Sequence, residues 1–346
     1  MYYFTFIIFV LHFLFGQSWH NHPELNWHSI ETEHFFIHFH DETERSAREA
    51  ATVAESVYKP ITELYQFEPD SKTHIIIKDT DDYANGAAYY YDNKIEIWAM
   101  PLDFEMRGSH RWLQNVITHE FIHIVQIGAS MKYPRRFPGF YFQILSYEQE
   151  KRKDVLYGYP NSIISYPLPG TAVPPWFAEG TAQFMTENIN YDYWDSKRDM
   201  ILRDRVLNDN ILSFNAMNTF GKKGIGNEST YNQGFAFVRF LANEYGEKKL
   251  FEISKALTKK TNYSINKAMK EVLNKNGQEL WNIWTEYLKN DYKDRLHAID
   301  IQYDGKVLED EGITNFHPVW SPNDSAFIYL SNKKNDYFGH TDLYLY

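Results

Sequence analysis

One apolar segment near the middle of the chain carries three polar side chains in a spacing that limits how the chain can fold. The segment runs from about Ser109 to Ile127 and contains His119, Glu120 and His123. A helix over these residues is apolar on nearly every side, which predicts that it is buried. Its apolar residues are Trp112, Leu113, Val116, Ile117, Phe121, Ile124 and Val125. Because buried polar side chains require partners, the rest of the chain must supply them.

The spacing of the two histidines is typical of a metal site. Residues four positions apart lie on one face of a helix, so His119 and His123 can direct imidazole nitrogens at one metal ion. Glu120 can reach a metal-bound water without ligating the metal, which is the arrangement of a zinc hydrolase with its general base. The alternative is that both histidines are core residues bonded to neighbours. We expect Gly128 to end this helix.

A second apolar segment, residues 174–185, offers a third metal ligand. Its prolines predict the start of a helix, and Glu179 lies inside that helix. Small residues at 180–182 would let another helix approach closely, which predicts that Glu179 meets His119 and His123. A catalytic zinc site has three protein ligands and one open position, and these residues would complete it. The alternative is a solvated helix glutamate.

The run His119–His123 followed by Trp176–Ala182 resembles the gluzincin metallopeptidases. The resemblance is closest to the bacterial peptidase MA-like domains, which are often fused to a TolB-type β-propeller. It covers roughly residues 30–295. It implies an α+β, thermolysin-like fold with a small mixed sheet, an active-site helix and a mostly helical C-terminal lobe.

The resemblance also assigns roles to single residues. One Zn²⁺ per chain would be held by His119, His123 and Glu179, and Glu120 would be the general base. The segment that begins at Tyr231 is similar to the Tyr-x-x-Gly segment of the aminopeptidase N branch, where the tyrosine hydroxyl stabilises the oxyanion. The alternative for Tyr231 is an ordinary core tyrosine.

Two departures from the family pattern bear on specificity. Residues 85–99 lack the Gly-x-Met-Glu-Asn signature of the aminopeptidases, which favours an endopeptidase. Gln183 stands where some gluzincins have an aspartate that orients a zinc histidine, so the partner of the histidines is left open. The resemblance assigns the edge strand that pairs with the substrate backbone to Lys94–Ala99.

Composition excludes several classes of protein. The chain has 35 basic and 46 acidic residues, a net charge of −11, which argues against nucleic acid as a partner. It has no cysteine, which excludes a disulfide scaffold, a cysteine metal site and a lipobox anchor. Residues 2–15 are apolar but short for a membrane span, and small residues follow. We expect a signal peptide over residues 1–18, with a buried N-terminal strand as the alternative, and no other membrane span.

Patterning predicts the other elements. His34–His40 alternates as a half-buried strand with its histidines on a solvated face, and Asp41–Tyr65 reads as a helix capped by Asp41. Residues 129–175 are expected to be irregular, with a short helix at Tyr141–Leu145. Further expected strands are His74–Lys78, which should be buried, and Lys94–Ala99; expected helices lie near 196–208, 229–245, 247–258, 264–275 and 277–294, with Gly246 and Gly277 as breaks.

The residue pattern of the sequence changes from about Tyr303. Residues 316–331 resemble the Trp-Ser-Pro-Asp-Gly signature of a TolB-type blade, with a turn at Asn323–Asp324, and residues 342–346 fit the next strand. We expect a peptidase domain over 19–300 and an incomplete propeller over 301–346, so that the chain is the front of a longer protein. The alternative is a small terminal hairpin.

Together these features predict a secreted zinc metallopeptidase. Glu120 would take a proton from zinc-activated water as it attacks the peptide bond of a peptide or protein substrate. The expected location is secreted, periplasmic or associated with a bacterial cell envelope, and the propeller would offer a surface to a protein partner. The alternatives are a catalytically silent peptidase-like binding module and a hydrolase of non-peptide substrates.

Overall fold

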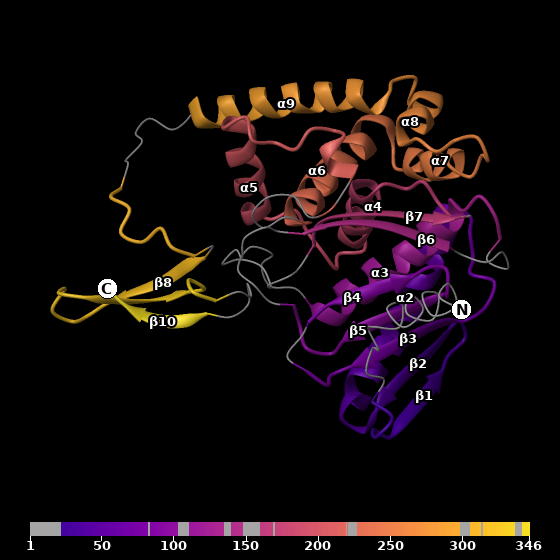
Figure 1. The fold of residues 1–346 in the computed structure, drawn as a ribbon, viewed down its shortest axis with the longest axis horizontal. Coiled ribbons are helices and arrows are strands. Elements are labelled where there is room, and N and C mark those ends of the chain that lie inside the picture. The colour runs from indigo at the N-terminus through magenta and orange to yellow at the C-terminus, as the bar shows by residue number, and fades with distance from the viewer. Residues whose placement is uncertain are drawn as a thin grey trace, which may run out of the picture.

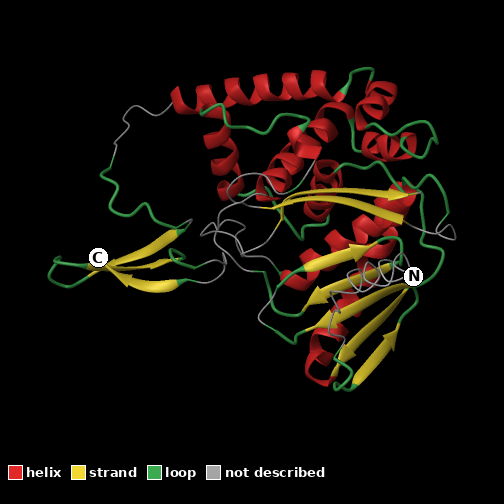
Figure 2. Cartoon of the chain, viewed as in Figure 1, coloured by secondary structure: helices red, strands yellow, loops and turns green. Residues whose placement is uncertain are grey.

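The computed structural model describes residues 22–81, 84–102, 111–134, 140–147, 160–168, 170–218, 220, 227–297, 305–312, 314–335 and 341–346. The expected signal peptide and Ser109 lie outside the described residues. The chain has a mixed α+β fold: a sheet with helices packed on it, then a mostly helical part, then a small separate sheet (Figures 1 and 2). In the described part of the chain, every helix is too short or too polar to cross a membrane.

The first sheet has five strands in the order β1-β2-β3-β5-β4. The three central strands β2, β3 and β5 are parallel, and the two outer strands pair antiparallel. The mixed sheet expected from the sequence is therefore confirmed. The strands are β1 (Trp27–Glu31), β2 (Phe35–His40), β3 (Thr73–Lys78), β4 (Gly86–Tyr89) and β5 (Lys94–Trp98).

The position predicted for the edge strand is wrong. β5 lies between β3 and β4, so its backbone is paired on both sides. The edge strand on this side of the sheet is β4, and β1 forms the other edge. The turn after Tyr89 folds the chain from β4 back into an antiparallel hairpin with β5, with Asn93 in the left-handed region at φ +51°. A local pattern predicts a strand but not its neighbours, which explains the error.

The histidines of β2 do not form a solvated face. Phe35, Ile37 and Phe39 are buried as expected, but His40 is also buried, with 1% of its surface exposed. The His38 Nε2 atom lies 2.8 Å from Nδ1 of His74 on β3. The neighbouring elements cover positions that alternation alone assigns to solvent. Similarly, β3 is buried on one face only, because its residues alternate between buried and half-buried.

Asp41 does not cap the long helix. Asp41–Thr43 form a 3-10 turn, and helix α2 runs over Glu44–Tyr65 with Thr43 at its N-cap. The Asp41 carboxylate instead accepts a hydrogen bond of 3.0 Å from Nδ2 of Asn26 and lies 2.5 Å from Nε2 of His28. It therefore ties the start of the helical region to β1.

The helices expected from periodicity are confirmed, with end points that differ from the expected ones by up to three residues. Gly128 does not end the histidine helix, because it lies inside the last turn of α3, which ends at Ala129. A Cβ at residue 128 would lie 2.6 Å from the Phe67 ring, so this glycine allows close packing instead. Gly246 breaks the chain between α6 and α7 at φ +91°. The helices after α2 are α3 (Trp112–Ala129), α4 (Pro175–Asn188), α5 (Ser196–Leu207), α6 (Asn227–Tyr245), α7 (Lys248–Ala256), α8 (Ile265–Leu273) and α9 (Gly277–His297).

The small residues of α4 allow close packing against α6, and not against the histidine helix α3 as expected. A Cβ at Gly180 would collide with the backbone of Gly234 on α6, and a Cβ at Gly234 would lie 2.5 Å from the Trp176 carbonyl oxygen. The close approach is therefore between α4 and α6, not between α4 and the histidine helix. It fixes α4 against α6, while α4 also packs against α3.

The segment between α3 and α4 is more regular than predicted. β6 (Phe140–Tyr147) and β7 (Pro160–Leu168) pair as an antiparallel ribbon, labelled in Figure 1. The short helix expected at Tyr141–Leu145 is wrong, because these residues form the middle of β6. Aromatic and β-branched residues favour a strand once a partner strand is present.

The C-terminal strands match the sequence expectation. β8 (Asn315–Trp320), β9 (Phe327–Ser331) and β10 (Asp342–Leu345) form an antiparallel sheet in the order β10-β9-β8. The turn lies at the expected place, with Asp324 at φ +55°. The strands are therefore confirmed, and their assignment to a propeller blade stays a prediction.

The ion-paired Glu96 gives the first sheet a pH-dependent contribution to stability. Lys78 and Lys94 both pair with its carboxylate. Burial tends to raise the pKa of Glu96, but the two lysines outweigh it and hold the pKa below its ordinary value of 4.5. The contribution is therefore fully present above pH 4.5 and is lost as the pH falls through the lower folded-state pKa.

We expect Glu96→Gln to lower the free energy of unfolding at pH 7 by about 1–2 kcal/mol. This value lies between the loss typical of an exposed ion pair and that of a buried one. Denaturant unfolding measured at pH 7 and at successively lower pH checks this, and the variant should approach the wild type in acid. Glu63→Gln, which removes an exposed pair with Lys59, is the matched control and should change little. Equal destabilisation of Glu96→Gln at every pH would contradict the expectation.

Candidate metal centre

Helices α3 and α4 bring the three predicted metal ligands together. The Nε2 atom of His119 lies 3.0 Å from Oε2 of Glu179, and Nε2 of His123 lies 3.2 Å from the same oxygen. The two Nε2 atoms are 3.1 Å apart. The Glu179 side chain is only 12% exposed, so the alternative of a solvated glutamate is wrong.

Local sequence and packing explain this convergence. The four-residue spacing puts both histidines on the side of α3 that faces α4. α4 begins at Pro175, which lies in its first turn, and Gly180 lets α4 lie close to α6. Glu179 precedes Gly180 by about 100° around the helix, so its carboxylate points toward α3 instead of α6.

The three atoms have the geometry and chemistry of a metal ligand set. Donor atoms around a tetrahedral ion with bonds of about 2.1 Å lie about 3.4 Å apart, close to the separations of these atoms. Two imidazole nitrogens and one carboxylate oxygen suit a first-row transition metal. His119, His123 and Glu179 can therefore hold a metal ion.

Charge in this cluster is balanced within the buried site. Burial by itself raises the pKa of Glu179, but the interactions with His123 and His119 outweigh it and hold the pKa far below its usual range. Burial lowers the pKa of His123, and the Glu179 carboxylate more than reverses this and raises it. The carboxylate is therefore ionised, and a metal cation can replace the proton that compensates it.

Glu120 lies beside the ligand set but faces the edge strand. Its side chain is 7% exposed, and the Ala88 backbone N–H of β4 donates a hydrogen bond to its carboxylate. A Cβ at Gly86 would lie 2.9 Å from Oε1 of Glu120 and would collide with Val116. Burial raises the pKa of Glu120, although the two histidines oppose the shift. Gly86 therefore lets the edge strand pass directly over this carboxyl group.

A small, mostly polar pocket opens from the site toward the N-terminal end of α3. His119, Glu120 and Tyr231 all line it. The Tyr231 ring centre lies 6.4 Å from that of His119, so the predicted tyrosine is near the metal centre. Gln183 also lines the pocket, and its buried Oε1 has no hydrogen-bond partner among the described residues. The sequence did not identify which side chain would orient the zinc histidines. In the described part of the chain, Nδ1 of His123 has no hydrogen-bond partner.

Sequence reasoning missed a buried ion pair in the wall of this pocket. Arg198 Nη1 lies 2.6 Å from Oδ1 of Asp192, and both side chains are buried. Asp195 accepts a hydrogen bond from the Arg198 backbone and caps α5 between them. The cap was visible in the sequence as an acidic residue before a helix, but the ion pair was not, because a six-residue spacing across a helix start has no periodic signature.

No protein-family model matches this chain, and no curated protein matches it. The main feature of the site is the convergence of three ligand atoms in one buried place.

We expect Glu179→Ala to remove most of the metal affinity, because two ligands remain where three converge. Mass spectrometry of the purified protein, after incubation with Zn²⁺ at neutral pH, should find about one ion per chain in the wild type. His38→Ala, which alters the histidine pair on the first sheet, is the control and should keep that ion. An unchanged metal content in Glu179→Ala would show that the ion binds elsewhere.

Proposed function

We propose that this protein is a zinc-dependent metallopeptidase in which His119, His123 and Glu179 hold one Zn²⁺ and Glu120 is the general base. Support comes from three ligand atoms that converge at zinc-like separations beside a buried carboxyl group that stays outside the ligand set. Imidazole and carboxylate ligands are those of many catalytic zinc sites. A thiol ligand is impossible, since the chain has no cysteine.

We also propose that the fold belongs to the thermolysin-like gluzincins. The mixed sheet, the central helix α3 with both histidines, and the mostly helical part after α4 support this proposal. The ribbon β6–β7 then lies in the long stretch of chain between the ligands His123 and Glu179, and β8–β10 corresponds to the beginning of a TolB-like propeller. A signal peptide over residues 1–18 and a location outside the cytoplasm complete the proposal.

Each residue of the proposed site has its own role in hydrolysis. When bound, Zn²⁺ supplies Lewis acidity, which polarises a carbonyl group and makes water more acidic. The Glu120 carboxylate accepts a proton from the water that attacks the peptide carbonyl and gives it to the leaving amine nitrogen. A pKa raised by burial suits a group that must both accept and return a proton. The Tyr231 hydroxyl donates a hydrogen bond to the carbonyl oxygen as negative charge develops there.

The edge strand β4 replaces β5 as the proposed binding strand for the substrate backbone. Asn85 accepts a backbone hydrogen bond from Trp98, so residues 85, 87 and 89 face β5. The backbone groups of Gly86 and Ala88 then point away from β5, toward Glu120 and the metal centre. An extended peptide laid along this edge would pass its scissile bond directly over the site.

We expect Glu120→Gln to keep its zinc and to lose hydrolysis by at least about 100-fold, the usual contribution of general base catalysis. The amide keeps the shape of the carboxyl group but cannot accept a proton. Peptide cleavage followed by mass spectrometry, together with metal content, measures both effects. Unchanged cleavage would sink the mechanism. Zinc binding without any cleavage by the wild type would instead favour the catalytically silent binding module.

Tyr231→Phe should lower kcat by about 100-fold while KM and metal content change little, because the hydroxyl acts on charge that appears only in the transition state. Steady-state kinetics on a cleaved peptide give the two constants. Tyr193→Phe, at a tyrosine that is 49% exposed, is the matched control. A Tyr231→Phe variant as active as the wild type would remove this residue from the site.

A further inference from the structure

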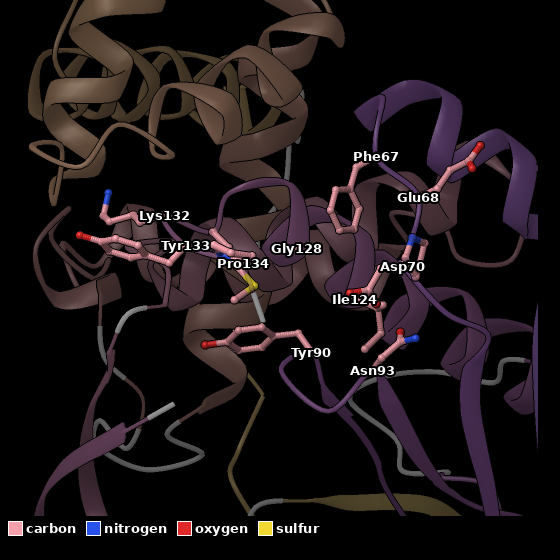
Figure 3. A pocket seen from close by; sticks show the side chains of 12 residues that line it. Phe67, Glu68, Asp70, Tyr90, Asn93, Ile124, Gly128, Lys132, Tyr133 and Pro134 are labelled. Carbon is pink, nitrogen blue, oxygen red and sulfur yellow. The ribbon is translucent and has the colours of Figure 1, made fainter. Parts of the chain in front are cut away.

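A second and larger pocket lies near the C-terminal end of α3 (Figure 3). It encloses about 360 Å³, compared with about 70 Å³ for the polar pocket beside His119. Figure 3 shows Phe67 on one side of Ile124 and Gly128, and Tyr90 on the other. The walls come from the end of α2, the turn between β4 and β5, and the end of α3 with the residues after it.

The walls of this pocket are mainly apolar because of how α2 ends. Gln66 adopts φ +47° at the C-cap of α2, and the chain then turns so that Phe67 packs on Gly128. Ile124, Tyr90 and Met131 complete the apolar surface. This lining favours a large hydrophobic group over a charged one.

Charged groups around the pocket do not change that preference. Lys132 lines the pocket, but its ammonium group donates hydrogen bonds to the carbonyl oxygens of Leu257, Lys259 and Asn262. The ammonium group is therefore committed to the chain after α7. Glu68 and Asp70 lie at the exposed rim, where water screens their charges.

The pocket lies on the line that the edge strand follows. β4 passes over α3, with Gly86 against Val116 and Glu120. Tyr90 follows the last residue of β4 and lines the pocket together with Ile124, one helical turn after Glu120. One turn of a helix advances about 5.4 Å and two strand residues advance about 7 Å. The pocket therefore begins about two substrate residues along β4 from the point where this strand passes over Glu120.

We propose that this pocket is a substrate subsite that receives a large apolar or aromatic side chain about two residues before the cleaved bond. The proposal rests on the proposed peptidase function and deepens it. Antiparallel pairing with β4, the slightly more stable arrangement, runs the substrate from Tyr90 toward Gly86. The residues before the cleaved bond then lie over the pocket, and those after it lie toward Arg198 and Gln183.

Profiling of cleavage sites tests the proposal. The full-length zinc-loaded protein is incubated with a peptide library, and the products are sequenced by mass spectrometry. We expect enrichment of Phe, Tyr, Leu or Met about two residues before the cut, by about 10-fold over Ala. A flat profile there, a preference for Lys or Arg, or an apolar preference only after the cut would overturn the proposal.

Substitutions in the pocket make the test specific. Met131→Trp should fill the pocket and abolish the preference for large residues, while peptides with Ala at that position are still cleaved. Met131→Ala should widen it and keep the preference. Tyr91→Ala changes the residue beside Tyr90 in the same turn, outside the pocket lining, and is the matched control. An unchanged preference in Met131→Trp would contradict the assignment.

Binding separates this inference from the proposed function. Isothermal calorimetry with the Glu120→Gln protein compares one peptide carrying Phe at the favoured position with the same peptide carrying Ala. We expect about 10-fold tighter binding of the Phe peptide, and loss of that difference in Glu120→Gln/Met131→Trp. Equal affinities would overturn the subsite. If the Phe peptide binds more tightly but the wild type cuts nothing, the pocket stands as a binding site for a large apolar side chain and the peptidase function fails.

Discussion

Two histidines and a glutamate from two different helices lie in contact inside an apolar interior, and much of the structure serves to tolerate them. A buried carboxylate is costly unless an opposite charge compensates it. Here the compensation comes from His123 and His119, which hold the pKa of Glu179 far below its ordinary value. A cation in the same place would provide the same compensation more completely. The requirement for charge balance and the proposed metal chemistry therefore favour the same arrangement.

Close backbone approaches keep this arrangement rigid. Gly180 and Gly234 let α4 and α6 touch, which fixes the helix that carries Glu179. Gly86 lets the edge strand pass over Glu120, and the Ala88 N–H donates to the same carboxyl group. The ligand Glu179 and the proposed base Glu120 are thus each held by a neighbouring element that could not come so close if these glycines carried side chains. Preorganisation of this kind is what a catalytic site needs.

The two pockets on either side of the metal centre differ in size and character. The pocket near His119 is small and polar, with the ion pair of Asp192 and Arg198 in its wall. The pocket near Ile124 is larger and mainly apolar. A substrate that crosses the metal centre along β4 would meet both pockets. The difference between them would give the proposed peptidase one favoured substrate direction and a preference for one kind of side chain.

Features that repeat along one segment could be predicted from the sequence: the helices, the faces they bury, and the two histidines on one side of α3. The sequence also indicated Glu179, because a carboxylate in an apolar helix needs a partner. Three features became visible only in the folded chain: β4 is an edge strand, residues 140–147 pair with 160–168, and Asp192 forms an ion pair with Arg198. Periodicity records which side of an element is buried, whereas strand order and distant ion pairs depend on which segments become neighbours, and no local pattern contains that information.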